Sequence, residues 1–337
     1  MPDRNIHLVK AAFHAQFKKA MELRGISASY YFKKFKLPVE IDDPESLLPL
    51  KPFFQLINVL AIDEEMPDFG SFVAQTTPWH QVLSLGPLIE NSKNLGSLLR
   101  TFCDIASSQS SLVKFTLVDE GTSSWFCYSD VPIDKGDIQM ELYRITSMIQ
   151  LVQLASGPGW LPEFVSLNMP WNASVKDCPS ITKSTICYSQ VDSAISIPTG
   201  LLNLPVQVEI PNSLVQDTVK NASQYSEFAA SVRQIIDGYV LTGSMTIENL
   251  AHLTDQSVRT LQRRLKSAGL NFNLLTNEAR YRHATDKLLN STLSVAEIAR
   301  LLGYSDPAHF SRAFRRWSGV SPSEFVTANR IRNFRNV

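Results

Sequence analysis

Apolar residues recur at helical spacing over much of the first hundred residues. Between residues 11 and 24, Phe13, Phe17 and Met21 fall on one face of a helix, and Gly25 follows as a stop signal. The same pattern predicts two further helices, over residues 53–61 and 95–105. The start of the chain is therefore predicted to be largely helical.

Beyond residue 110 the pattern changes to short apolar and aromatic runs. Residues 112–119 and 123–129 flank a Glu-Gly pair, which predicts a β-hairpin. Residues 137–155 return to a helical pattern, which a Gly-Pro-Gly sequence ends. Further strands are predicted over residues 163–168 and 185–197. We therefore expect residues 1–200 to form one α+β domain.

A connecting segment separates this domain from the rest of the chain. Residues 198–211 contain three prolines and show little periodicity, so we place a linker over residues 201–222. The apolar patterns that follow it are all helical. Residues 223–337 are therefore predicted to form a separate all-α domain.

Charge is distributed unevenly, although the 337-residue chain has no formal net charge. Residues 241–337 contain 14 lysines and arginines against 7 acidic residues and carry +7. The preceding 240 residues contain 18 basic and 25 acidic residues and carry −7. A basic C-terminal part on an acidic body is typical of a protein that binds a polyanion, although a solvated charged surface gives the same count.

The sequence lacks the signatures of several other protein classes. No apolar run reaches the roughly 20 residues that span a bilayer. Residues 1–10 contain no apolar signal core, so we expect a cytoplasmic protein with no membrane partner. The four cysteines lack metal-ligand spacing, which favours free thiols over a metal site. Motifs for nucleophilic, zinc-dependent and nucleotide-dependent catalysis are missing, so we expect neither an enzyme nor a cofactor.

Two segments of the C-terminal part resemble each other at an offset of 48 residues. Ala251 and Ser257 in the first correspond to Ala299 and Ser305 in the second. Each segment has the pattern of a short helix with a small residue at a close crossing, a turn, and a second helix capped by the serine. The second copy has a glycine for the left-handed turn, and we expect Asp255 to adopt that conformation in the first. The repeat therefore predicts two helix-turn-helix modules.

The second helix of each module has one apolar and one polar face. Leu261 and Leu265 are predicted to point inward in the first module, and Phe310 and Phe314 in the second. The outward residues are Arg259, Gln262 and Arg263 in the first module and His309, Arg312, Arg315 and Arg316 in the second. Arginine hydrogen-bonds guanine and glutamine hydrogen-bonds adenine, so such helices suit the major groove of DNA.

At these residues the chain resembles the AraC/XylS family of bacterial transcription regulators. Residues 294–325 are similar to the family signature almost throughout, and residues 259–265 are similar to its first recognition helix. The resemblance implies that both recognition helices enter successive major grooves of promoter DNA. It makes Arg259, Gln262, Arg263, Ala308, His309 and Arg312 the base-reading candidates. Arg264 and Arg316 are expected to contact phosphate or solvent, and Pro307 falls on a contact position without an N–H to donate.

The N-terminal domain resembles the sensor domain of an AraC subgroup that includes regulators of ornithine use and of virulence. The similar stretches are residues 25–38, 43–50, 66–70, 159–162 and 197–201. The resemblance implies a homodimeric regulator, more often an activator, that works with RNA polymerase and responds to a small-molecule effector. Because no residue pattern here indicates a sugar site, arabinose is not inferred as that effector.

Aromatic side chains in and near the predicted strands are the candidates for an effector pocket. They are Phe115, Trp125, Phe126, Tyr128, Trp160 and Phe164. Ligand pockets are mostly apolar, with a few polar groups that fix orientation, but aromatic residues in strands more commonly form ordinary core. Two further alternatives remain open: an N-terminal domain that only dimerises or binds a protein partner, and a non-specific architectural DNA binder.

Overall fold

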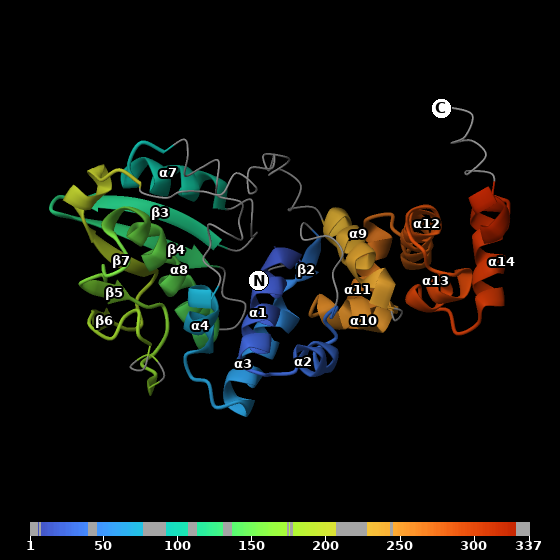
Figure 1. The fold of residues 1–337 in the computed structure, drawn as a ribbon, viewed down its shortest axis with the longest axis horizontal. Helices are drawn as coiled ribbons and strands as arrows, with labels where there is room; N and C mark the ends of the chain where they lie inside the picture. The colour runs from blue at the N-terminus through green and yellow to red at the C-terminus, as the bar shows by residue number, and fades with distance from the viewer. Residues whose placement is uncertain are drawn as a thin grey trace. The chain divides into compact units, whose positions relative to one another are not determined.

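The computed structural model describes residues 6, 8–39, 46–76, 92–106, 113–130, 137–173, 175, 178–206, 228–242 and 245–327. The chain divides into two compact units, whose elements are shown in Figure 1. The N-terminal unit contains residues 7–45 and 49–226, and the C-terminal unit contains residues 227–337 together with 1–6 and 46–48. Residues 207–222 of the expected linker lie outside the described residues.

Helices dominate the first part of the N-terminal unit. α1 (Ala11–Leu23), α3 (Leu50–Asp63) and α7 (Leu95–Ala106) confirm the three helices that the apolar spacing predicts. The pattern does not predict α2 (Ala28–Lys34) and α4 (Phe69–Thr76), whose seven and eight residues are too few for a clear helical period. It also misses two short elements of this unit, β1 (Leu8–Lys10) and the 3-10 helix η2 (Thr199–Asn203), and it misses β2 (Leu47–Pro49), whose first two residues belong to the C-terminal unit.

A five-stranded mixed sheet forms the second part of this unit, in the order β3-β4-β7-β5-β6. β3 (Val113–Glu120) and β4 (Ser123–Asp130) form the predicted hairpin. The single strand predicted over residues 185–197 is instead two strands, β6 (Thr185–Cys187) and β7 (Ser193–Pro198). β6 runs parallel to β5 (Phe164–Ser166) and β7 antiparallel to it, so the chain reverses between them. Ser189, with φ +58°, interrupts the extended run in this connection.

α8 (Ile138–Ser156) is the central helix of the N-terminal unit. Asp137 begins it by accepting a hydrogen bond from the backbone N–H of Met140 at 3.2 Å. The helix contacts α3, α4 and α7 as well as β7 and is buried along most of its length. Gly70 of α4 lies so close to it that a Cβ atom there would stand 1.7 Å from the carbonyl oxygen of Gln139. α8 therefore joins the helices and the sheet into one core.

The described residues 228–242 and 245–327 of the C-terminal unit are all helical in organisation, as predicted. α9 (Phe228–Tyr239) and the 3-10 helix η4 (Val240–Thr242) are followed by α10 (Ile247–Leu253) and α11 (Val258–Ser267). α12 (Phe272–Asn290) connects these to α13 (Val295–Leu301) and α14 (Pro307–Ser318). An α+β unit is thus followed by an all-α unit. Across the described residues, no helix combines the length and apolar character that crossing a membrane requires.

Candidate DNA-binding interface

α10 and α11 form the first helix-turn-helix module. Ala251 of α10 is buried, as the small residue at a close helix crossing should be. The turn places Asp255 at φ +52°, which confirms the left-handed conformation predicted for it. The backbone N–H of Gln256 then donates to the carbonyl oxygen of Ala251 at 2.9 Å. Ser257 caps α11 by accepting a hydrogen bond from the backbone N–H of Thr260 at 3.2 Å.

α13 and α14 form the second module with the same turn geometry. Gly303 has φ +82°, and the backbone N–H of Tyr304 donates to the carbonyl oxygen of Ala299 at 2.9 Å. α13 begins with a capping box, in which Ser294 and Glu297 hydrogen-bond each other's backbone N–H groups. The side-chain hydrogen bond from Ser294 lowers the pKa of Glu297. The expected repeat is therefore present in the backbone as well as in the sequence.

The start of α14 differs from the prediction. Ser305 is not its cap; the cap is Asp306, whose carboxylate accepts a hydrogen bond from the backbone N–H of Ala308 at 2.8 Å. The reason is Pro307, whose fixed φ suits the first helical position and whose missing N–H needs no partner there. The proline therefore shifts the cap to the residue directly before it.

Each recognition helix packs its apolar face inward. Leu261 and Leu265 of α11 are buried, and so are Phe310 and Phe314 of α14. The rings of Phe310 and Phe314 lie 5.8 Å apart, and Tyr281 of α12 lies 5.7 Å from Phe314. This packing turns the opposite faces of α11 and α14 toward solvent.

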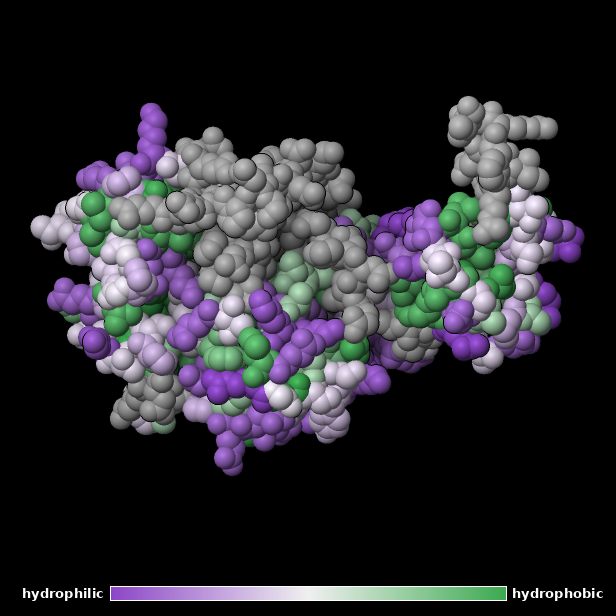
Figure 2. All heavy atoms as spheres, in the orientation of Figure 1, coloured by the Kyte–Doolittle hydropathy of each residue, from purple (hydrophilic) through white to green (hydrophobic). Residues whose placement is uncertain are grey.

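All eight predicted DNA-binding residues are exposed in the structure. They are Arg259, Gln262, Arg263, Ala308, His309, Arg312, Arg315 and Arg316. Figure 2 shows hydrophilic side chains along the outer edge of the C-terminal unit, where Figure 1 draws α14. Within the described residues, the side chains of Arg259, Arg263 and Arg312 make no hydrogen bond or ion pair. His309 lies 3.8 Å from the Asp306 carboxylate.

Two further basic residues of α11, Lys266 and Arg264, differ in their exposure. Lys266 is exposed three residues after Arg263, and helical spacing alone would have added it to the candidates. Arg264 is half-buried, and its guanidinium lies 4.0 Å from the ring centroid of Phe228 in α9. No local sequence signal connects these two residues, because they stand 36 positions apart.

The aromatic candidates of the N-terminal unit do not all share one site. Phe115, Phe126 and Tyr128 lie together in the core facing α7, where Phe102 is 5.0 Å from Phe115. Trp125 stands on the opposite face of β4 and donates to the Glu120 carboxylate at 3.1 Å. The two remaining candidates are peripheral: Trp160 packs half-buried at the edge of the core, and Phe164 is 39% exposed.

A buried polar cluster adjoins the three core aromatics. The carboxylate of Glu141 accepts hydrogen bonds from the hydroxyls of Tyr128 and Ser193. The guanidinium of Arg144 lies 5.2 Å from the Tyr128 ring centroid and 5.7 Å from that of Phe54. Burial, and then the charge of Glu141, raise the pKa of Tyr128 well above its ordinary value. No local sequence pattern reveals this cluster, because Tyr128, Ser193 and the Glu141–Arg144 pair come from three different elements. No group of His, Cys, Asp and Glu in the described parts of the chain is arranged to hold a metal ion.

The chain matches two protein families. A helix-turn-helix domain family matches residues 250–328, and the family described as the N-terminal arabinose-binding domain of AraC transcription regulators matches residues 25–206. The chain is 23% identical to the transcriptional regulator VirS of Mycobacterium tuberculosis, over 94% of this chain and 96% of that protein. It is 22% identical to the ornithine utilization regulator of Pseudomonas aeruginosa, over 95% and 97%.

Among solved structures, the chain is similar to the transcriptional regulator CdpR of Pseudomonas aeruginosa. The two are 14% identical with a TM-score of 0.42, and the match covers 94% of this chain and 98% of CdpR.

The N-terminal family match by itself covers more than half of the chain. The matched domains and relatives are those of transcription regulators, not of enzymes. The chain therefore belongs to the AraC family of DNA-binding transcription regulators.

Proposed function

We propose that this protein recognises specific promoter sequences with α11 and α14. The observation that carries the proposal is the exposed polar face of each recognition helix, opposite a buried apolar face. The base-reading residues are Arg259, Gln262 and Arg263 on α11 and Ala308, His309 and Arg312 on α14. Lys266, Arg315 and Arg316 supply positive charge for phosphates, which gives affinity without sequence preference.

Selection from a randomised duplex DNA library, with the purified full-length protein, tests this proposal. We expect wild-type protein to enrich a defined site. Arg263→Ala or Arg312→Ala should cost about 1–3 kcal/mol of binding and relax the base preference at one position each. Arg100→Ala removes the same charge from an exposed side chain of the N-terminal unit and should leave the enriched site unchanged.

Two other outcomes would revise the proposal. If either recognition-helix variant binds all sequences more weakly by the same factor, the changed arginine contacts phosphate instead of a base. If wild-type protein enriches no sequence, the protein is an architectural DNA binder and base reading is wrong.

The N-terminal unit is proposed to bind a small-molecule effector and to form a homodimer. The family description of residues 25–206 and the buried Glu141–Arg144 cluster support effector binding. Buried charges cost free energy unless they are well paired, and such groups gather at ligand sites. An effector acts by binding one conformation or oligomeric state better than another. We propose that the protein acts in the cytoplasm and activates transcription by RNA polymerase at its promoters.

Native mass spectrometry of the full-length protein, compared with its denatured mass, tests the sensor role. Excess mass that disappears on denaturation would identify a co-purified effector, and the same spectrum gives the oligomeric state. A clean monomer at the mass of the chain would argue against both a tightly bound effector and a stable dimer. It would instead favour an N-terminal unit that responds to a protein partner.

A further inference from the structure

α9 contacts the first recognition helix directly. The guanidinium of Arg264 on α11 lies over the ring of Phe228, 4.0 Å from its centroid. Arg264 follows Arg263 and so points about 100° further around the helix axis, since an α-helix has 3.6 residues per turn. It therefore lies on the flank of α11, beside the face that carries the base-reading side chains. A contact at this flank resists rotation of α11 about its own axis.

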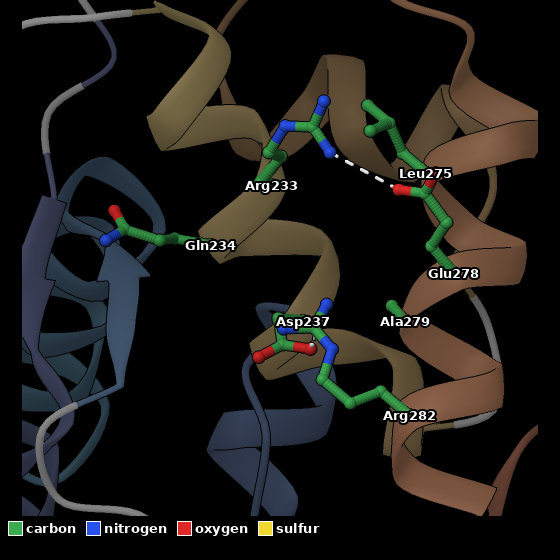
Figure 3. Close-up of a pocket in the computed structure, with 7 residues that line it drawn as sticks. All are labelled: Arg233, Gln234, Asp237, Leu275, Glu278, Ala279 and Arg282. Carbon is green, nitrogen blue, oxygen red and sulfur yellow. Dashed lines mark hydrogen bonds and ion pairs between the residues drawn. The ribbon is translucent and has the colours of Figure 1, made fainter.

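α9 is itself held firmly against α12. Val232 of its apolar face is fully buried. Arg233 pairs with Glu278 at 3.3 Å, and Asp237 pairs with Arg282 at 3.3 Å. Figure 3 shows these side chains reaching between the two helices. They line a pocket of about 220 Å³. Phe228, the first residue of α9, is therefore a defined anchor point for Arg264.

The second recognition helix is oriented differently. Tyr281 of α12 contacts Phe314 and Trp317 of α14, with ring centroids 5.7 and 6.2 Å away. Phe325, which follows α14 in the chain, also packs on Phe314, with the two ring centroids 5.4 Å apart. These contacts are aromatic and come from α12 and the residues after α14. α11 thus has a cation–π contact to α9, whereas α14 is oriented by aromatic packing.

We propose that Phe228 is a positioning residue for DNA reading, which holds Arg264 and thereby sets the base preference of the first module alone. The inference rests on the proposed function, because it assumes that α11 reads bases.

The test compares full-length Phe228→Ala and Phe228→Trp with wild type in the randomised-library selection. Arg263→Ala and Arg312→Ala assign which half of the enriched site each module reads. We expect Phe228→Ala to flatten the preference in the α11 half and to weaken binding to the wild-type site roughly 2- to 5-fold. The α14 half should be unchanged. Phe228→Trp keeps an aromatic ring under Arg264, so it should restore both the base preference of the α11 half and the affinity for the wild-type site.

A double-mutant cycle then asks whether Phe228 acts through Arg264. In an Arg264→Ala background, Phe228→Ala should have no further effect on the α11 half-site. The inference would be overturned if the effects of the two substitutions on the α11 half-site were additive. It would also be overturned if Phe228→Ala flattened the base preference of both half-sites equally, or left it unchanged. If wild type enriches no site, the proposed function fails and the inference falls with it. If it enriches a site that Phe228→Ala reads identically, only the inference fails.

Discussion

A buried histidine should make the stability of the N-terminal unit depend on pH. His14 of α1 is completely buried, its ring stacks on Phe53 at a centroid distance of 4.1 Å, and neither ring nitrogen has a hydrogen-bond partner. Burial lowers the pKa of His14 from 6.5 to about 3. Between these two values the unfolded chain binds a proton that the folded chain excludes.

The sign and size of the effect follow from proton linkage. Because the folded-state pKa is depressed, the stability is fully present above pH 6.5 and is lost as the pH falls toward 3. Each pH unit below the unfolded pKa costs about 1.4 kcal/mol, so a change from pH 7.5 to 5.0 should remove about 2 kcal/mol. Leucine cannot be protonated, so the His14→Leu variant should not lose this unfolding free energy. It also removes two unpartnered polar atoms, so it should already be more stable at pH 7.5, by about 1–3 kcal/mol.

Urea unfolding followed by tryptophan fluorescence measures this difference. Four of the five tryptophans precede residue 207, so the signal reports mainly the N-terminal unit. The gap in unfolding free energy between His14→Leu and wild type should widen by about 2 kcal/mol between pH 7.5 and 5.0. His309→Leu makes the same substitution at an exposed histidine and is the matched control. A gap that stays constant with pH would refute a neutral, proton-excluding His14.

Two further substitutions test the packing and the capping. Gly70→Ala places a Cβ atom 1.7 Å from the carbonyl oxygen of Gln139 and should destabilise the N-terminal unit by about 3 kcal/mol or more in urea unfolding. Gly159→Ala, where a Cβ atom would meet nothing within 4 Å, is the matched control, and equal losses would contradict the close approach. Asp306→Ala removes the cap of α14 and should cost about 0.5–2 kcal/mol, seen as a lower melting temperature. Asp306→Asn keeps an accepting oxygen and should recover most of that loss; a failure to recover would point to the negative charge instead.

Local patterns in the sequence determined the structures that near neighbours in the chain control. The hairpin, the helix-turn-helix repeat and the left-handed turn at Asp255 were all predicted, because turns and caps are made by residues a few positions apart. The cap of α14 was also local, but the prediction followed the repeat to Ser305 and underweighted Pro307. The single strand predicted over residues 185–197 ran through the mostly polar residues 189–193, where Ser189 has a left-handed backbone and the chain reverses.

The sequence by itself thus determined the family, the two helix-turn-helix modules and which side of each recognition helix is polar. Tertiary structure decided which residues meet. Trp125 and Phe126 are neighbours in the chain but face opposite sides of the sheet, and the period of two along a strand would have separated them. Glu141 and Ser193 meet although they are 52 residues apart, and Arg264 meets Phe228 across two intervening elements. Contacts of this kind arise only when helices and sheets pack, because no periodic pattern of apolar residues specifies which element a side chain will touch.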